Sequence, residues 1–518
     1  MSTVGALAVG APRRGTTLAT VLGVLFLTFL DTTIVSVALG NIQYNLGAGV
    51  IPLQWVVNAY SLVFASLMLI AGSLGDRLGR KWVMVAGIAV FCLGSVLCAL
   101  APSVAWLIFG RAVMGVGAAA SEPGTLSVLR QTYPQRAQRA RALGAWAAIS
   151  GLALALGPVI GGLLVGLDGW RAVFWFNLAL GLLLFGAAMR YVPNSADPQP
   201  GGPDIGGFVL GAVALGSLIF AGISGEHAGY GSPWILALFA LSGLALLGFL
   251  IVERRVRSPM LDLHYVTDPA VGGALFVAFA VYFGVFSIFF LTALYLDVAL
   301  GYSGGRMAGV FAPMAVAIVV GSLVSGWWVG RVGPRAAMIV GCLVSAAGIG
   351  AARHYLDADP RFAALAVALA VAGLGFGVAV VPLTAAVLGH VPAAHSGMAA
   401  SATNTARQLG SVVGVAALGA IVNAQLTHGF GKSLETSGYS GSSKQFILDL
   451  LETGGSQAAG VDIAHPPALI KPLVDQAIAA FRSGVHIALG VSATLIVVSA
   501  IAIAVVPRTS ISPDTEFD

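Results

Sequence analysis

Three ionisable side chains stand inside long apolar stretches of this sequence, where a charge is costly. Asp31 interrupts the apolar run 17–39, and Arg111 and Glu122 interrupt the run 104–128. Ionisable groups within hydrocarbon face the interior of a helix bundle and mark paths for protons or substrates. Burial favours the neutral form of a carboxyl group, so Asp31 is a candidate for taking up and releasing a proton. The alternative is a structural Asp31 that only makes hydrogen bonds.

The two runs place Asp31 and Arg111 at similar depths. At about 1.5 Å per residue, each lies roughly 10–12 Å from the outer end of its run, so we expect the two to pair. Protonation of Asp31 would then loosen the pair, and a static tether is the alternative for Arg111. Glu122 follows Arg111 by about three helical turns on the same face and precedes Pro123. It is a candidate proton acceptor nearer the inner side, or else a solvated residue among the headgroups.

The rest of the chain consists of elements that would hold such groups in a membrane. Of 518 residues, 58% are hydrophobic and only 9% are charged, which is the composition of a polytopic membrane protein. Fourteen apolar runs are long enough to span a bilayer as helices: 17–39, 53–74, 82–101, 104–128, 142–166, 170–192, 205–225, 233–252, 269–292, 305–329, 336–356, 361–386, 400–423 and 485–507. Most of the 26 Lys and Arg residues lie on the side of the two termini, which predicts that both termini are cytoplasmic.

The same composition excludes several classes of function. Loop topology explains the net charge of +5, so we predict no nucleic-acid partner. Cys92, Cys98 and Cys342 lie in apolar runs without metal-ligand spacing, so we expect no metal site and no cofactor. The runs contain no nucleophile–base set, which disfavours a membrane enzyme, and two bundles with buried charges disfavour a channel. The sequence has no glycine-rich nucleotide-binding loop followed by Lys, so the expected energy source is an ion gradient.

A short charged link joins the second and third runs. An antiparallel hairpin would place this link in water at the cytoplasmic face, and its glycines favour a tight turn and the close approach of a neighbouring helix end. We expect Asp76 to face the positive N-terminus of that helix, and the arginines to pair with carboxylates or lipid phosphates. A plain positive-inside anchor is the alternative. The residues of this predicted cytoplasmic gate are Gly72, Asp76, Arg77, Gly79, Arg80 and Lys81.

The link recurs weakly in the second part of the chain. Segment 326–335 repeats the glycine and arginine placement of 72–81, with Gly330 in place of Asp76. Two such hairpins on the same side predict two homologous bundles with the substrate site between them. We therefore predict a six-helix bundle over 1–195, two inserted helices over 196–262 and a second six-helix bundle over 263–518. The second bundle includes a long extracellular loop, 424–484, in which Ser443–Glu452 and Pro467–Arg482 have the periodicity of interfacial helices or a small cap.

Two further runs carry unusual residue patterns. In the run 142–166 a cluster of small residues and one proline favours a flat, bendable surface that permits close helix contact; general packing in lipid is the alternative. The residues of this cluster are Gly151, Gly157, Pro158, Gly161 and Gly162. In the run 400–423, Asn404, Arg407 and Gln408 form a polar face by helical spacing. If that helix starts later than expected, Arg407 is a cytoplasmic anchor instead.

Several segments, taken in order, are similar to the signatures of one family. They are Leu30–Gly40, Gly72–Trp82, Arg111–Gly117, Gly151–Gly162, Trp170–Asn177, Leu300–Ser303 and Asn404–Gly410. Through them the chain resembles the major facilitator superfamily, in its fourteen-helix drug:proton antiporter branch. Ser36, Gly40 and Met114 depart from the usual residues of that branch.

This resemblance implies an all-α membrane protein with the major facilitator fold, made of two six-helix bundles plus two inserted helices. It also implies a proton-coupled antiporter, not an enzyme, that exports amphipathic drugs or secondary metabolites by alternating access. The helix with Gly151–Gly162 would then move at the interface between the bundles. Expected partners are a small amphipathic substrate, protons and membrane lipids, around a monomer in the bacterial cytoplasmic membrane. Export of lipids or of an endogenous metabolite, and uptake of a solute, stay open as alternatives.

Overall fold

The computed structural model describes most of the chain, and its regular structure there is helical. The described residues are 14–48, 50–196, 204–256, 259, 261–296, 300, 302, 304–356, 361–392, 396–437 and 471–506. The first helices, which we call the N-terminal helix group, are α1 (Arg14–Ile34), α2 (Leu39–Leu46), α3 (Val50–Leu78), α4 (Arg80–Ala99), α5 (Val104–Thr132), α6 (Arg136–Asp168) and α7 (Arg171–Tyr191). A hairpin of α8 (Ile205–Ala228) and α9 (Pro233–Glu253) follows, and then the short α10 (Leu263–Thr267). The last helices, the C-terminal helix group, are α11 (Pro269–Leu294), α12 (Gly304–Val332), α13 (Pro334–Tyr355), α14 (Phe362–His390), α15 (Ser396–Ser437) and α17 (Lys471–Val505).

The helices agree with the apolar runs of the sequence. Among the described residues, twelve helices are long and apolar enough to cross a membrane, or thirteen when the bent helix α3 is included. Helix α3 bends by 52° between Met68 and Ile70, and α6 covers the remaining predicted run. The first run differs from the prediction, because α1 ends at Ile34 and a 3₁₀ turn, Val35–Ala38, leads into α2. The protein is therefore an all-helical, multi-spanning membrane protein.

Two helices extend much further than the sequence predicted. Helix α15 runs on to Ser437, and α17 begins at Lys471, before the predicted start at residue 485. The predicted helical periodicity of Pro467–Arg482 is confirmed from Lys471 onward, but these residues form the first turns of α17 and not a separate interfacial helix. Their apolar face is buried: Phe481 is 6% exposed and its ring lies 5.7 Å from that of Tyr295. The predicted helix 443–452 lies outside the described residues.

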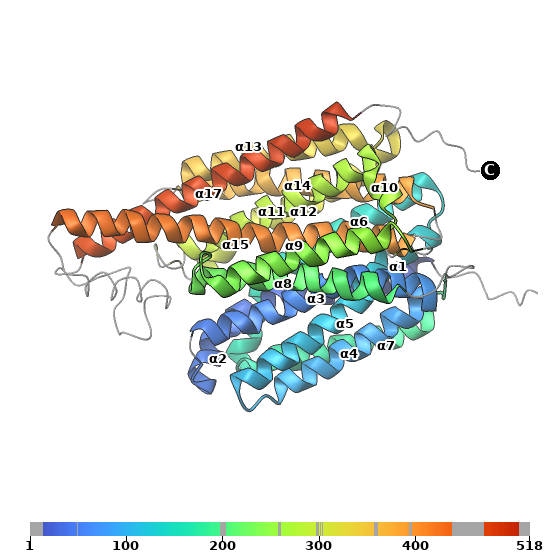
Figure 1. Cartoon of the computed structure of the whole chain (residues 1–518), viewed down its shortest axis with the longest axis horizontal. Coiled ribbons are helices and arrows are strands. Elements are labelled where there is room, and N and C mark those ends of the chain that lie inside the picture. Colours follow the sequence, from blue (N-terminus) through green and yellow to red (C-terminus); the bar gives the residue numbers. More distant parts are fainter. Residues whose placement is uncertain are drawn as a thin grey trace, which may run out of the picture.

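The two helix groups lie side by side along the molecule (Figure 1). Helices of each group pack mainly against one another, and the groups meet where α3 and α5 contact α15 and where α6 contacts α12 and α14. The hairpin of α8 and α9 lies at this boundary, because α8 contacts both α3 and α15. Helices α15 and α17 project beyond the other helices at one end of the molecule (Figure 1).

The weak sequence repeat corresponds to a repeated turn. Gly79 is the single residue between α3 and α4, and Gly333 is the single residue between α12 and α13. Both have a positive φ, 102° and 86°, a backbone region that glycine enters without strain. The two positions are 254 residues apart, the spacing of the repeat in the sequence. We call the end of the molecule that carries both turns the Gly79 end.

Close packing through glycine is also repeated. A Cβ on Gly87 in α4 would lie 2.7 Å from the carbonyl oxygen of Gly117 in α5. A Cβ on Gly341 in α13 would lie 2.6 Å from the amide nitrogen of Ala379 in α14. Gly87 and Gly341 are also 254 residues apart. Equivalent helix pairs of the two groups therefore approach each other backbone to backbone, as small residues permit in lipid.

Candidate functional site

Asp31 and Arg111 form a buried ion pair within the N-terminal helix group. Arg111 Nη1 donates to Asp31 Oδ2 at 2.5 Å, and neither side chain is exposed. The amide of Asn177 in α7 donates to the other carboxylate oxygen, Oδ1, at 2.7 Å. The predicted contact is confirmed, and Asp31 faces the interior of the group. Three helices, α1, α5 and α7, therefore meet at one carboxylate.

Arg111 is also tied to the neighbouring helix α3. Its Nε donates to the carbonyl oxygen of Val56 at 2.9 Å, and its guanidinium carbon lies 4.5 Å from the ring centre of Tyr60. The hydroxyl of Tyr60 in turn donates to the carbonyl oxygen of Thr28 in α1 at 3.0 Å. Met114, which departs from the family pattern, places its thioether sulfur 3.9 Å from Arg111 Nη1. Direct contacts thus connect Asp31 and Arg111 to α1, α3, α5 and α7.

Glu122 lies deep in the molecule and not at a solvated headgroup position. Its side chain is 1% exposed, so the solvated alternative is wrong. Helix α5 continues through Pro123. Neither carboxylate oxygen of Glu122 has a hydrogen-bond partner in the described part of the chain. The charge of Arg407 in α15 acts on Glu122, and the phenol of Tyr282 in α11 is within electrostatic range of both.

Arg407 is buried inside α15 and is not a surface anchor. It is 2% exposed, donates from Nη1 to Asn404 Oδ1 at 2.9 Å, and donates from Nη2 to the hydroxyl of Thr384 in α14. The hydrogen bond to Asn404 agrees with the predicted polar face of this helix. Gln408 is half-buried and accepts a hydrogen bond from the Ser411 hydroxyl at 3.5 Å instead. The reading of Arg407 as a surface anchor is therefore wrong, because the helix begins eleven residues earlier, at Ser396.

At the Gly79 end, Asp76 joins the two helix groups. Its Oδ2 accepts a hydrogen bond from the backbone amide of Met398 at 2.9 Å, in the first turn of α15. Its Oδ1 accepts from Arg80 Nε at 2.8 Å and Nη2 at 2.6 Å. The predicted position of Asp76 at a helix N-terminus is confirmed, as is the pairing of an arginine with a carboxylate. Lys81 donates to the carbonyl oxygen of Met189 at 2.6 Å, in the last turn of α7.

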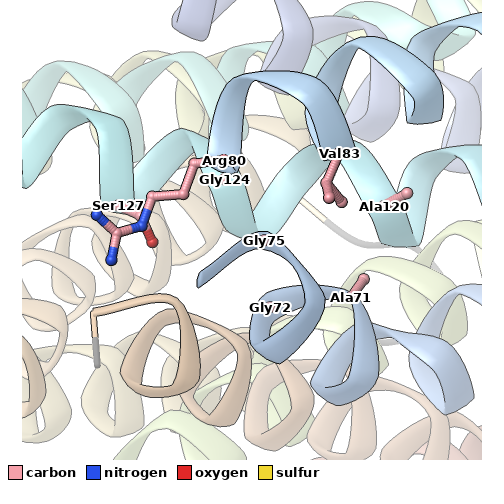
Figure 2. A pocket seen from close by; sticks show the side chains of 8 residues that line it. All are labelled: Ala71, Gly72, Gly75, Arg80, Val83, Ala120, Gly124 and Ser127. Atoms are coloured by element: carbon pink, nitrogen blue, oxygen red, sulfur yellow. The ribbon is translucent and has the colours of Figure 1, made fainter. Parts of the chain in front are cut away.

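The other residues of this region are mostly helical, which corrects part of the prediction. Only Gly79 makes the turn, while Gly72 and Arg77 lie within α3. Gly72 lines a cavity of about 10 Å³ between α3, α4 and α5, close to Arg80 and Ser127 (Figure 2). That volume is about the space needed by one water molecule. The link is thus a compact helix junction rather than an extended loop.

A second contact between the groups at this end involves Arg130. Its Nη2 donates to the carbonyl oxygen of Val391 at 2.6 Å, just after α14. Nearby, a Cβ on Gly330 would lie 3.9 Å from the Cα of Ala137 in the first turn of α6. Three contacts therefore close the Gly79 end: α3 with α15, α5 with the residue after α14, and α12 with α6.

The glycines of α6 face two different partners. Gly151 packs closely against the side chain of Ile318 in α12, which belongs to the other helix group. Gly157 and Gly161 pack against Thr33 and Ile34 of α1. Gly162 is exposed, and position 158 lies inside the continuous helix α6. The close packing that the glycines predict is thus present. Gly157 and Gly161, however, pack within the N-terminal helix group and not at the interface between the two groups.

Sequence reasoning missed several residues at these sites. Asn177 was noted only as part of a motif, although a lone amide in an apolar run is a visible signal. Thr384, Trp146 and Tyr282 belong to runs whose apolar pattern gave no indication of their contact with Arg407. Only the three-dimensional arrangement brings them together.

Such a fold, with many spans, two repeated helix groups and buried ion pairs, defines a membrane transporter. Residues 21–415 match the family model described as Major Facilitator Superfamily. The chain belongs to the Major Facilitator Superfamily, whose members move small substrates across membranes.

Named relatives support this assignment. The chain is 33% identical over 487 residues to the multidrug resistance protein Stp of Mycobacterium tuberculosis, covering 93% of this chain and 90% of the relative. It is 36% identical over 409 residues to the methylenomycin A resistance protein of Bacillus subtilis, covering 78% and 87%. Among solved structures, the human organic anion transporter MFSD10 (TETRAN) has a TM-score of 0.61 at 14% identity, covering 94% of this chain and 100% of the other. That likeness shows the shared fold.

Proposed function

We propose that this protein exports amphipathic drugs or secondary metabolites across the cytoplasmic membrane of a bacterium, in exchange for protons. Relatives named for multidrug resistance and methylenomycin A resistance support export of such compounds. The observation that carries the proton coupling is Asp31, a fully buried carboxylate held by two donors, Arg111 and Asn177. Such a group binds a proton only when its contacts change, so proton binding and helix packing are linked.

The proposed cycle follows from these contacts. Ionised Asp31 holds α1, α5 and α7 together through Arg111 and Asn177. Protonation removes the negative charge, so Arg111 keeps only its bonds to α3 and the helices repack. The two helix groups, corresponding to the predicted bundles 1–195 and 263–518, then alternate around a substrate site between them. Glu122 is a second proposed proton acceptor in this cycle.

We infer the orientation from the charged residues at the Gly79 end. Arg77, Arg80 and Lys81 flank the turn at Gly79, and positive residues in short loops favour the cytoplasmic face. The two termini lie on this side in the proposal, and the closed Gly79 end corresponds to a transporter shut toward the cytoplasm. The proposed unit is a monomer surrounded by lipid.

The test uses inverted membrane vesicles, in which an imposed proton gradient should drive accumulation of substrate. The substrates are a panel of lipophilic cations and neutral aromatic drugs. Asp31→Asn should abolish gradient-driven accumulation while the protein still inserts into the membrane at normal abundance. Asp262→Asn is the matched control, because Asp262 caps the short helix α10 outside the spans and should transport normally.

Two results would contradict the proposal. Normal gradient-driven transport by Asp31→Asn would remove Asp31 from the coupling. Accumulation of none of the panel by the unaltered protein would redirect the assignment to a lipid or an endogenous metabolite.

A further inference from the structure

Arg407 lies between two aromatic rings that come from different helix groups. Its guanidinium carbon is 4.8 Å from the ring centre of Trp146 in α6 and 5.5 Å from that of Tyr282 in α11. Both distances are within the range of cation–π attraction, which is strongest for Trp and strengthens when the cation is desolvated. Arg407 is fully buried here. The two rings therefore form a place where a positive group is stabilised without a carboxylate contact.

The ring of Trp146 is held in position by neighbours of Glu122. Its Nε1 donates to the hydroxyl of Thr125 at 3.0 Å, and that hydroxyl donates to the backbone carbonyl of Glu122 at 2.6 Å. The ring also forms an edge-to-face pair with Phe29 of α1, with ring centres 6.3 Å apart. One face of the cation position is thus fixed before any ligand arrives, and fixed groups lose little freedom on binding.

Glu122 is the acidic member of this cluster, and its carboxyl group makes no hydrogen bond within the described residues. Its side chain is 1% exposed. The Nη atoms of Arg407 donate hydrogen bonds to Asn404 and Thr384 and not to Glu122. Arg407 is nevertheless close enough to interact electrostatically with Glu122. Leaving a buried carboxyl group without partners is costly. The carboxyl group of Glu122 therefore lacks a hydrogen-bond partner, while the nearby rings of Trp146 and Tyr282 already hold the Arg407 guanidinium.

We propose that Glu122, Trp146 and Tyr282 form a binding site for the positively charged group of an organic cation, and that Arg407 is its tethered occupant. A bound cation displaces the Arg407 guanidinium from the two rings and pairs with Glu122. Arg407 then stays within its own helix group on Thr384 and Asn404. This assignment rests on the proposed export function and names a substrate class for it.

The tethered occupant has a clear consequence for affinity. A cationic ligand must compete with Arg407 for the rings and is repelled by its charge. A neutral ligand of the same shape meets neither effect. Removing Arg407 should therefore strengthen the binding of cations alone, and removing the charge of Glu122 should weaken the binding of cations alone.

The experiment measures equilibrium binding to the purified full-length protein in detergent, without a proton gradient. The probes are tetraphenylphosphonium, a cation, and triphenylphosphine oxide, a neutral relative. Arg407→Gln should bind tetraphenylphosphonium about tenfold more tightly, the size of one desolvated cation–π contact. Glu122→Gln should bind it about tenfold or more weakly, the size of one lost charge-assisted contact. Binding of triphenylphosphine oxide should stay within about twofold in both variants, since it carries no charge to compete or pair.

Two matched variants complete the test. Arg407→Lys keeps the positive charge and should stay close to the unaltered protein in its affinity for the cation. Arg407→Met, which is apolar and of similar length, replaces Arg407→Gln if the latter elutes as an aggregate. Unchanged or weaker cation binding by the uncharged variants would overturn the proposal, because Arg407 would then bind the ligand itself. Equal shifts for both probes in Glu122→Gln would also overturn it, because they would indicate a packing effect.

The outcome is separable from that of the vesicle assay. Binding is measured without a gradient and does not involve Asp31. If Asp31→Asn transports normally while the binding pattern holds, the proton coupling fails and the cation site stands. If Asp31→Asn loses gradient-driven transport while the binding pattern is absent, the coupling stands and the cation site fails.

Discussion

Closure of the Gly79 end should depend on the charge of Asp76. The hydrogen bond from Met398 N to Asp76 Oδ2 crosses between the helix groups and is lost when that end opens, whereas the bonds from Arg80 remain within one group. A hydrogen bond to a charged acceptor contributes about 1.5–3 kcal/mol, and a carboxylate at a helix N-terminus adds about 0.3–1 kcal/mol. Water replaces part of this in the open form, which leaves a difference of about 2–3 kcal/mol, or about 30- to 150-fold in the equilibrium between closed and open forms.

The assay measures the distance between spin labels on the two groups by double electron–electron resonance. Leu78 and Val332 are suitable label positions, because they end α3 and α12 beside the two turns and are 63% and 61% exposed. Asp76→Ala should add a population at longer distance that is about 30- to 150-fold enriched relative to the unaltered protein. Asp76→Asn keeps an acceptor oxygen without the charge, and a neutral bond is roughly half as strong, so its enrichment should be about 5- to 12-fold.

The matched control is Asp268→Ala. Asp268 also accepts a backbone hydrogen bond at a helix N-terminus, from Ala270 N at 2.7 Å, but within the C-terminal helix group. Its loss should lower the unfolding free energy by about 0.5–2 kcal/mol and leave the label distances unchanged. The reasoning is refuted if Asp76→Ala leaves the distances unchanged, or if both variants shift them equally.

Three further predictions concern neighbouring features. Asn177→Ala should lower the unfolding free energy by about 1–3 kcal/mol, because it removes a buried donor to Asp31; a thermal midpoint equal to that of the unaltered protein would contradict this. Gly79→Ala should destabilise more than Gly333→Ala: both force a positive φ, at about 1–2 kcal/mol, but only at Gly79 would the new Cβ clash with a neighbour. Gly330→Asp should place a carboxylate at the N-terminus of α6 and favour the closed form by about 0.3–1 kcal/mol, measured with the same spin labels; enrichment of the open form would count against it.

Much of this architecture is readable from the sequence because hydrocarbon imposes simple rules. Runs of apolar residues long enough to cross a bilayer coincide with helices. A charge within such a run needs a partner. Asp31 and Arg111 lie at matching depths in the sequence, which predicts the ion pair that the structure contains. Carboxylates are stabilised at helix N-termini, so Asp76 in a glycine-rich link predicts a contact with a helix end. The structure has this contact, at the N-terminus of α15.

The remaining features depend on distances between helices that sequence periodicity does not encode. The sequence allows either a surface or a buried position for Arg407, because no clear signal marks the start of its helix at Ser396. Trp146 and Tyr282 lie far apart in the chain and meet only around Arg407. The length of α17 was missed because Phe481 and its neighbours showed helical periodicity but no hydrophobic run that would join them to the last span.

The two repeated turns show where the symmetry of the fold has been broken. Each turn brings the end of one helix against the first turn of a helix from the other group. On one side that contact is a charged hydrogen bond, from Met398 N to Asp76. On the other side Gly330 stands where Asp76 stands in the repeat, and it lies directly against Ala137. We therefore expect closure of the Gly79 end to be sensitive to charge at one of two equivalent contacts, while the other contributes packing that does not depend on charge.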